Sequence, residues 1–362
     1  MDFTADYADA RRRFRESATR LGWNRRAYDV GGIGPAGNDL TIDVALSPGA
    51  DTGRVLVVSS GLHGVEGPLG SAIQTELMER WSLTAGPGRA RAVLVHALNP
   101  FGFAWSRRSD AENVDLNRNF LDDAARYAGC PEAYRAFDPI LNPRRPPSRW
   151  DPFRARAIWA VARHGKDSLR AALVTGQYEF PQGLFFGGMG PSVTFRIVSE
   201  QLPSWLGHAE TVVHLDIHTG LGARGTHKLL VDYPLGPSER DRLTRWFGAN
   251  VFHEKSPGRV AYQARGSFGP WLMTRRFAPD YAFAFAEFGT YPDLPVLAGL
   301  RAENQVHHWG GDAEPVSRAK ARLRELFCPA SQAWRARTLA DGLDLVERAL
   351  KGLAERDRQG LR

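Results

Sequence analysis

The sequence has few of the residues that build disulfide scaffolds, thiolate metal sites or membrane spans. Cys130 and Cys328 are the only cysteines among 362 residues, too few for a disulfide framework or a cysteine-based metal cluster. No apolar run reaches the roughly 18 residues that a membrane-spanning helix needs, and the polar first residues lack the features of a signal peptide. We therefore expect a soluble, cytoplasmic protein that does not bind membranes.

Lysine is also scarce, so the formal net charge of +7 comes from arginine. The arginines are scattered among acidic residues, without a long basic tract or an interleaved aromatic stripe, which argues against a nucleic-acid-binding module. Hydrophobic residues make up 43% of the chain and charged residues 24%, as in ordinary globular proteins. A solvated basic surface, with some arginines reserved for an anionic substrate, fits this composition.

Strand-like and helix-like stretches alternate along the chain. Residues 1–28 show apolar residues at helical spacing, and 40–46 alternates like a strand with one exposed face. This order predicts a single α/β domain with a twisted, mixed, mostly parallel β-sheet and helices on both faces. Further strands are expected at 55–58, 92–97, 211–217 and 281–288, and further helices at 70–81, 313–327 and 331–353.

The stretch "SSGLHGVEG", residues 59–67, follows a buried strand and contains a histidine and a glutamate three positions apart. Loops after strands carry the ligand sites of open α/β sheets, and zinc accepts both an imidazole nitrogen and a carboxylate. His63 and Glu66 alone are a weak signal, because a turn histidine near a surface glutamate is common. A catalytic zinc site needs a third protein ligand.

The strand ending in "HLDIHTGLG", residues 214–222, supplies a candidate for that ligand. His218 lies where this strand meets a glycine-rich loop. His214 is more typical of a core histidine, and Asp216 suits an acceptor that fixes the tautomer of an imidazole. His63, Glu66 and His218 would leave one coordination position open for water.

Two further stretches carry side chains suited to hydrolysis. Glu287, in "YAFAFAEFGTY", lies among apolar residues that would raise its pKa and make it a general base; the alternative is a carboxylate paired with an arginine. In "AWSRRSDAENVDLNRNF", Arg107 or Arg108 could stabilise an oxyanion, and Asn117 with Arg118 could bind a substrate carboxylate. A polar loop of Arg–Asp pairs would explain the second stretch equally well.

Four motifs in a fixed order resemble the zinc carboxypeptidase family, the carboxypeptidase A-like enzymes. They are "LHGVEG", "NPFGFAWSRRSDAENVDLNRNF", "DIHTGLG" and "FAEFGT", within about residues 40–310. They are more similar still to a bacterial branch allied to the aspartoacylase and succinylglutamate desuccinylase group. The resemblance implies one catalytic domain over 1–362, with an N-terminal helix at 1–28, a family-like core at about 40–310 and C-terminal helices at 313–353.

The resemblance also implies a role for each candidate residue. One Zn²⁺ ion would be held by His63, Glu66 and His218, with Glu287 as general base and later acid. "AYQARGSFGPW" resembles the family's mobile loop, in which Tyr262 would close over the substrate. Asn117 and Arg118 become the carboxylate clamp, and Arg107 or Arg108 the oxyanion arginine.

The sequence also departs from the family, and the departures concern the substrate. Gly269 stands where related enzymes carry the side chain that selects their substrate, and "GQYEFPQGLFFGG" places Gln177, Tyr178 and Phe185 either at the pocket or in loop packing. We expect a zinc metallopeptidase that cleaves an amide bond next to a free carboxylate. The alternatives are an N-acyl amino acid deacylase and a non-catalytic zinc-binding protein. The sequence does not indicate an oligomeric state.

Overall fold

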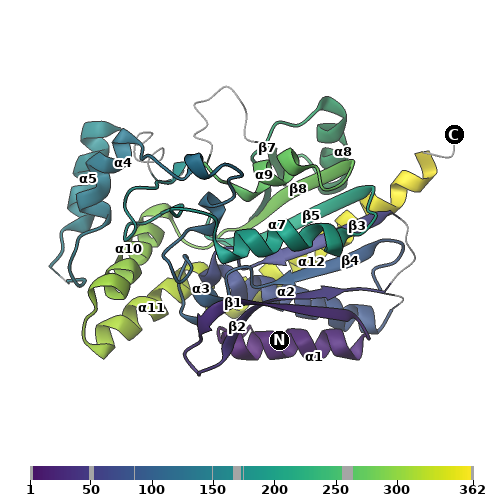
Figure 1. Cartoon of the computed structure of the whole chain (residues 1–362), viewed down its shortest axis with the longest axis horizontal. Coiled ribbons are helices and arrows are strands. Elements are labelled where there is room, and N and C mark those ends of the chain that lie inside the picture. Colours follow the sequence, from purple (N-terminus) through teal and green to yellow (C-terminus); the bar gives the residue numbers. More distant parts are fainter. Residues whose placement is uncertain are drawn as a thin grey trace.

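An eight-stranded mixed sheet forms the centre of the computed structural model, which describes residues 3–48, 53–84, 86–148, 150–165, 173, 175–254 and 264–359. The strand order is β1-β2-β4-β3-β5-β8-β6-β7 (Figure 1). The strands are β1 (Asn24–Ile33), β2 (Asp39–Leu46), β3 (Arg54–Ser60), β4 (Arg91–His96), β5 (Thr211–Thr219), β6 (His227–Val231), β7 (Phe252–Glu254) and β8 (Asp280–Phe288).

The four central strands β4, β3, β5 and β8 are parallel, whereas β1, β2 and β6 join their inner neighbours in antiparallel pairs. Every residue of β5 is buried, as expected for a parallel strand covered on both faces. The predicted fold class, an α/β domain with a mixed sheet flanked by helices, is therefore confirmed.

Helices cover both faces of the sheet (Figure 1). On one face, α2 (Gly67–Ser82) packs against β5, where Gly70 approaches the Ile217 side chain. On the other face, Phe268 of α9 (Phe268–Arg275) packs against His214, and α9 in turn contacts α7 (Val193–Leu206). The structure also describes the α-helices α1 (Tyr7–Arg20), α3 (Pro100–Ala104), α4 (Glu132–Leu141), α5 (Phe153–His164), α8 (Pro237–Phe247), α10 (Asp293–Trp309), α11 (Ala313–Phe327) and α12 (Gln332–Gln359).

Two expectations for the N-terminal part were wrong in detail. The first helix ends at Arg20, and Gly22 with φ +66° turns the chain into β1, so residues 24–28 are strand and not helix. The second strand, β2, is buried on both faces because it lies between β1 and β4 beneath α1. Within the described residues, no helix is long and apolar enough to cross a membrane.

Candidate metal centre

His63 and Glu66 lie in a tight turn between β3 and α2. Gly61 has φ +68°, a conformation that favours glycine, and the 3₁₀ turn Gly64–Glu66 follows directly. A Cβ on Gly64 would lie 2.1 Å from the carbonyl carbon of Gly102, so only glycine allows this approach to α3. The glycines thus bring the turn under the loop that follows β4, with both His63 and Glu66 buried.

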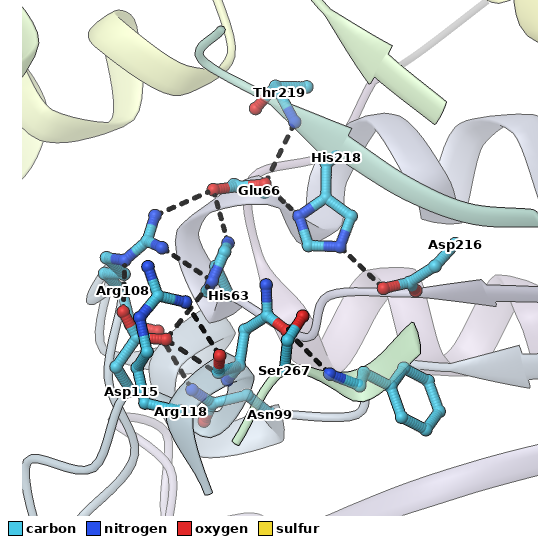
Figure 2. A network of polar contacts seen from close by, with 12 residues as sticks. His63, Glu66, Asn99, Arg108, Asp115, Arg118, Asp216, His218, Thr219 and Ser267 are labelled. Carbon is cyan, nitrogen blue, oxygen red and sulfur yellow. Dashed lines mark hydrogen bonds and ion pairs between the residues drawn. The ribbon is translucent and has the colours of Figure 1, made fainter. Parts of the chain in front are cut away.

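The two histidines meet on the Glu66 carboxylate (Figure 2). His63 Nδ1 lies 2.9 Å from Glu66 Oε1, and His218 Nδ1, from the end of β5, lies 3.1 Å from Glu66 Oε2. One donor atom from each residue lies within 4.8 Å of the others. Tetrahedral zinc with ligands at about 2 Å holds its donors about 3.3 Å apart. The buried donor set therefore fits a single ion after a small adjustment.

The outer nitrogen of each imidazole faces a second carboxylate. His218 Nε2 donates to Asp216 Oδ2 at 2.6 Å, and His63 Nε2 lies 3.3 Å from Asp115 Oδ1. Carboxylates in this position orient the imidazole of metal-binding histidines and increase its basicity. Asp216 thus directs Nδ1 of His218 at Glu66, whereas Nε2 of His63 lies between Asp115 and the Arg108 guanidinium, 2.7 Å from Arg108 Nη2.

Burial and charge act in opposite directions on these groups. Burial alone would raise the pKa of Glu66, but the imidazoles of His63 and His218 lower it below its ordinary value. Burial would lower the pKa of His218, but Asp216 and Glu66 raise it well above its ordinary value. The site is thus built around anionic carboxylates that favour a cation between them.

Glu287 lies beside His218 because the two residues are register partners on the parallel strands β8 and β5. Its Oε2 atom is buried and has no hydrogen-bond partner among the described residues. Burial raises the pKa of Glu287 to about 7, although the nearby His218 opposes the shift. A carboxylate of this kind can accept and return a proton near neutral pH.

The two consecutive arginines have different surroundings. Arg108 Nη2 lies 2.7 Å from His63 Nε2, and Arg108 Nε donates to Asp115 Oδ2 at 2.9 Å. Arg107 points elsewhere: its Nε lies 3.0 Å from Glu303 Oε1. Of the two candidates for the oxyanion arginine, the structure brings Arg108 to the centre and places Arg107 in a buried ion pair with α10.

His63 and Glu66 line a cavity of about 270 Å³ together with Arg108, Asn117, Arg118 and Glu287, and Thr219, the residue after His218, also lines it. Arg118 is buried, and its Nε atom has no hydrogen-bond partner within the part of the chain that the structure describes. Asn117 accepts a hydrogen bond from the Phe268 backbone N–H at 3.0 Å, which ties it to the start of α9. Tyr262 lies outside the described residues.

Several residues at the cavity were not singled out by sequence reasoning for this place. Asp115, from the stretch that could equally be a polar loop of Arg–Asp pairs, contacts His63 and Arg108. Asp232 and Ser267 also line the cavity. The signal in the sequence for this location was weak: Asp232 directly follows a strand, and Ser267 directly precedes a helix. Phe185 lies at the cavity, whereas Tyr178 packs beneath it and donates to the Arg118 carbonyl oxygen at 2.7 Å.

The fold is similar to that of carboxypeptidases. Bovine thrombin-activatable fibrinolysis inhibitor, solved with tick carboxypeptidase inhibitor, matches with a TM-score of 0.53 at 10% identity, covering 97% of each chain. Carboxypeptidase A from Helicoverpa armigera matches at 0.44 and 14% identity, over 87% of this chain and 73% of that one. A metallo-carboxypeptidase from Burkholderia cenocepacia matches at 0.46 and 11% identity, over 95% and 69%.

The chain belongs to the family described as protein of unknown function DUF2817, whose model matches residues 3–341. The comparison with curated proteins gave no match. The family assignment covers the whole sheet and all the residues of the candidate centre, but its description names no activity.

Proposed function

We propose that this protein is a zinc-dependent hydrolase that cleaves an amide bond next to a free carboxylate, as a carboxypeptidase does. The observation that carries the proposal is the convergence of three buried side chains suited to metal binding beside a carboxylate oxygen that has no hydrogen-bond partner among the described residues. The donors His63, Glu66 and His218 lie within 4.8 Å of one another, and Glu287 is the register partner of His218. The two histidines and the glutamate fit the donor preference of zinc.

Four residues around the proposed metal site, Glu287, Arg108, Arg118 and Asn117, each have a role in this reaction. Bound zinc would act as a Lewis acid toward the scissile carbonyl and lower the pKa of water. Glu287 takes the proton from the attacking water and returns it to the leaving amine. The Arg108 guanidinium donates to the oxygen that becomes negative. Arg118, with Asn117 beside it, binds the substrate carboxylate.

A second candidate is the removal of an acyl group from an N-acyl amino acid. This reaction uses the same chemistry. The cavity volume of about 270 Å³ lies below the roughly 300–1,000 Å³ of common ligand pockets, which favours a small substrate. A cavity of this size holds a small acyl amino acid more easily than several residues of a peptide.

One substrate panel tests both candidates. The protein is stripped with a chelator, reloaded with Zn²⁺, and offered N-blocked dipeptides, their C-terminal amides and N-acetyl amino acids. Zinc-dependent cleavage of blocked dipeptides with a free carboxylate supports the peptidase, and cleavage of only N-acetyl amino acids supports the deacylase. If the reloaded protein leaves all three groups intact, or if cleavage is the same without zinc, the proposal is wrong.

A further inference from the structure

A chain of buried hydrogen bonds runs from the core of the sheet to His218. Tyr281 OH lies 2.8 Å from His214 Nδ1, and His214 Nε2 lies 2.7 Å from Ser59 Oγ. Ser59 Oγ donates to Asp216 Oδ1 at 2.6 Å, and Asp216 Oδ2 accepts from His218 Nε2 at 2.6 Å. The links join strands β8, β5 and β3, which are neighbours in the sheet.

The sheet itself aligns these side chains. Ser59 is the register partner of Asp216, and His214 is the register partner of Phe283. Alternate residues of a strand share a face, so His214, Asp216 and His218 all point to the face that α9 covers. The chain of contacts therefore follows from rigid elements and not from a loop.

The donor and the acceptor of every hydrogen bond in this series can be assigned. Burial lowers the pKa of His214 to about 4, so its imidazole is neutral at pH 7, with one donor and one acceptor nitrogen. Ser59 has a single hydroxyl proton and gives it to Asp216, so His214 must donate to Ser59 through Nε2. Nδ1 is then the acceptor, and Tyr281 donates to it.

These bond directions also determine which oxygen of Asp216 accepts a hydrogen bond from His218. A buried polar atom without a partner destabilises the fold, so the Ser59 hydroxyl keeps Oδ1 of Asp216 occupied and leaves Oδ2 to His218. With the Nε2 proton of His218 held there, Nδ1 is the nitrogen that faces Glu66 at 3.1 Å. A metal ion that replaces the proton on Nδ1 therefore binds the lone pair of that nitrogen.

We propose that Tyr281, His214 and Ser59 are positioning residues that fix Asp216, and through it the Nε2–H tautomer of His218, for metal binding. The inference rests on the metal-binding part of the proposed function. None of the three touches the cavity, so they act on the ligand and not on the substrate. Outer partners of metal-binding histidines commonly contribute roughly 10- to 100-fold to metal affinity.

The first test measures zinc affinity by competition with a chromophoric chelator. We expect Ser59→Ala to weaken zinc binding by roughly 10- to 100-fold, and Tyr281→Phe to weaken it by a smaller factor. The matched control is Tyr7→Phe, which removes a buried hydroxyl bonded to Thr41 far from the centre and should leave zinc affinity unchanged. Equal affinities in all three variants and the unmodified protein would overturn the inference.

The second test needs no substitution and covers the case in which Ser59→Ala does not fold. Long-range proton–nitrogen NMR of the unmodified protein, labelled with ¹⁵N-histidine, reports which ring nitrogen of His214 carries its proton. A proton on Nε2 supports the inference, and a proton on Nδ1 overturns it. A protein that binds no divalent ion but shows the expected His214 tautomer would contradict the proposed function while preserving this hydrogen-bond chain.

Discussion

His218 and Glu287 stand side by side as register partners on two parallel strands, β5 and β8. The proposed metal ligand and the proposed proton acceptor are thus placed by the sheet ladder and not by flexible loops, which favours a precise geometry. Both residues lie at the carboxyl ends of their strands, the edge at which open α/β sheets place their ligand sites, with His218 buried and Glu287 half-buried.

Glu287→Gln should keep the metal and lose the reaction. The amide has nearly the same shape as the carboxylate but cannot take a proton from water, so kcat should fall by roughly 10²- to 10⁴-fold. Zinc content and kcat measured on the same preparation check this outcome. A variant that retained full activity, or that lost its zinc as well, would contradict the assignment of Glu287 as a base outside the metal ligands.

The reaction should slow on the acid side of neutrality. Burial raises the pKa of Glu287 to about 7, and a base works only when ionised, so kcat/KM should rise with pH until the carboxylate is deprotonated. A bound cation favours the ionised form, which places this limb at or below pH 7 in the zinc protein. Zinc occupancy is measured at each pH, because protonation of the ligands would mimic the effect. A rate that increases toward acid pH would exclude this role.

Arg107→Met should mainly lower the stability of the protein, and Arg108→Met should mainly lower kcat. Removal of Arg107 leaves the buried Glu303 carboxylate with Lys320, 3.1 Å away, as its charged partner. Loss of one partner of a buried pair costs about 3–5 kcal/mol, and Lys320 should reduce that cost. Arg108→Met should instead lower kcat by roughly 10²- to 10³-fold with a smaller change in stability.

Urea unfolding and kcat are therefore measured for both arginine variants. Zinc affinity is measured as well, because Arg108 also contacts His63. If Arg107→Met lowered kcat at unchanged stability, the assignment of the oxyanion role to Arg108 would be reversed.

Arg118→Met should remove the preference for a free carboxylate. The guanidinium is buried at the cavity, and hydrogen bonds to charged groups contribute about 1.5–3 kcal/mol. The unmodified protein should prefer a blocked dipeptide over its C-terminal amide by roughly 10- to 100-fold, and the variant should treat them alike. Arg135→Met, which removes an exposed ion pair with Glu179, serves as the control. An unchanged preference in Arg118→Met would show that the carboxylate binds elsewhere.

How much of the site the sequence could predict depends on how locally each residue is positioned. His63 and His218 could be proposed because His63 lies in the turn after the apolar strand β3 and His218 near the end of β5, and strand ends of a parallel sheet meet at one edge. The choice between Arg107 and Arg108 could not be made, because it depends on Glu303, which lies 196 positions away from Arg107 in sequence. Hydrogen bonds of that kind leave no local pattern.

The same reasoning explains which parts of the fold were predicted. The central strands are buried runs, and their apolar sequences identified them. Strand β1 has a mostly exposed or half-buried pattern, so its sequence lacks the apolar alternation of a core strand, and the helix before it was extended too far. The Asp115 contact with His63 was missed because the motif around it reads equally well as a loop of Arg–Asp pairs.

Stability at acid pH should depend on His96, a buried core histidine that is not part of the proposed catalytic site. Its ring stacks on Phe14 with centroids 4.8 Å apart, and its Nε2 lies 3.0 Å from Ser71 Oγ. Burial, with Arg15 and Arg11 nearby, lowers the pKa of His96 to about 3. In the unfolded chain a histidine has a pKa of about 6.5. Below about pH 6.5 the unfolded chain therefore binds a proton at His96, whereas the folded protein does not.

His96→Gln should flatten this pH dependence. Because the folded-state pKa is lowered, stability is fully present above about pH 6.5 and falls by about 1.4 kcal/mol per pH unit toward pH 3. The variant loses the ring stacking and should be less stable at pH 7, but the difference between the two proteins should shrink by about 2 kcal/mol between pH 7 and pH 5. Urea unfolding at each pH measures both curves. Parallel curves would mean that His96 binds its proton equally in the folded and unfolded chains, against the burial that the structure gives it.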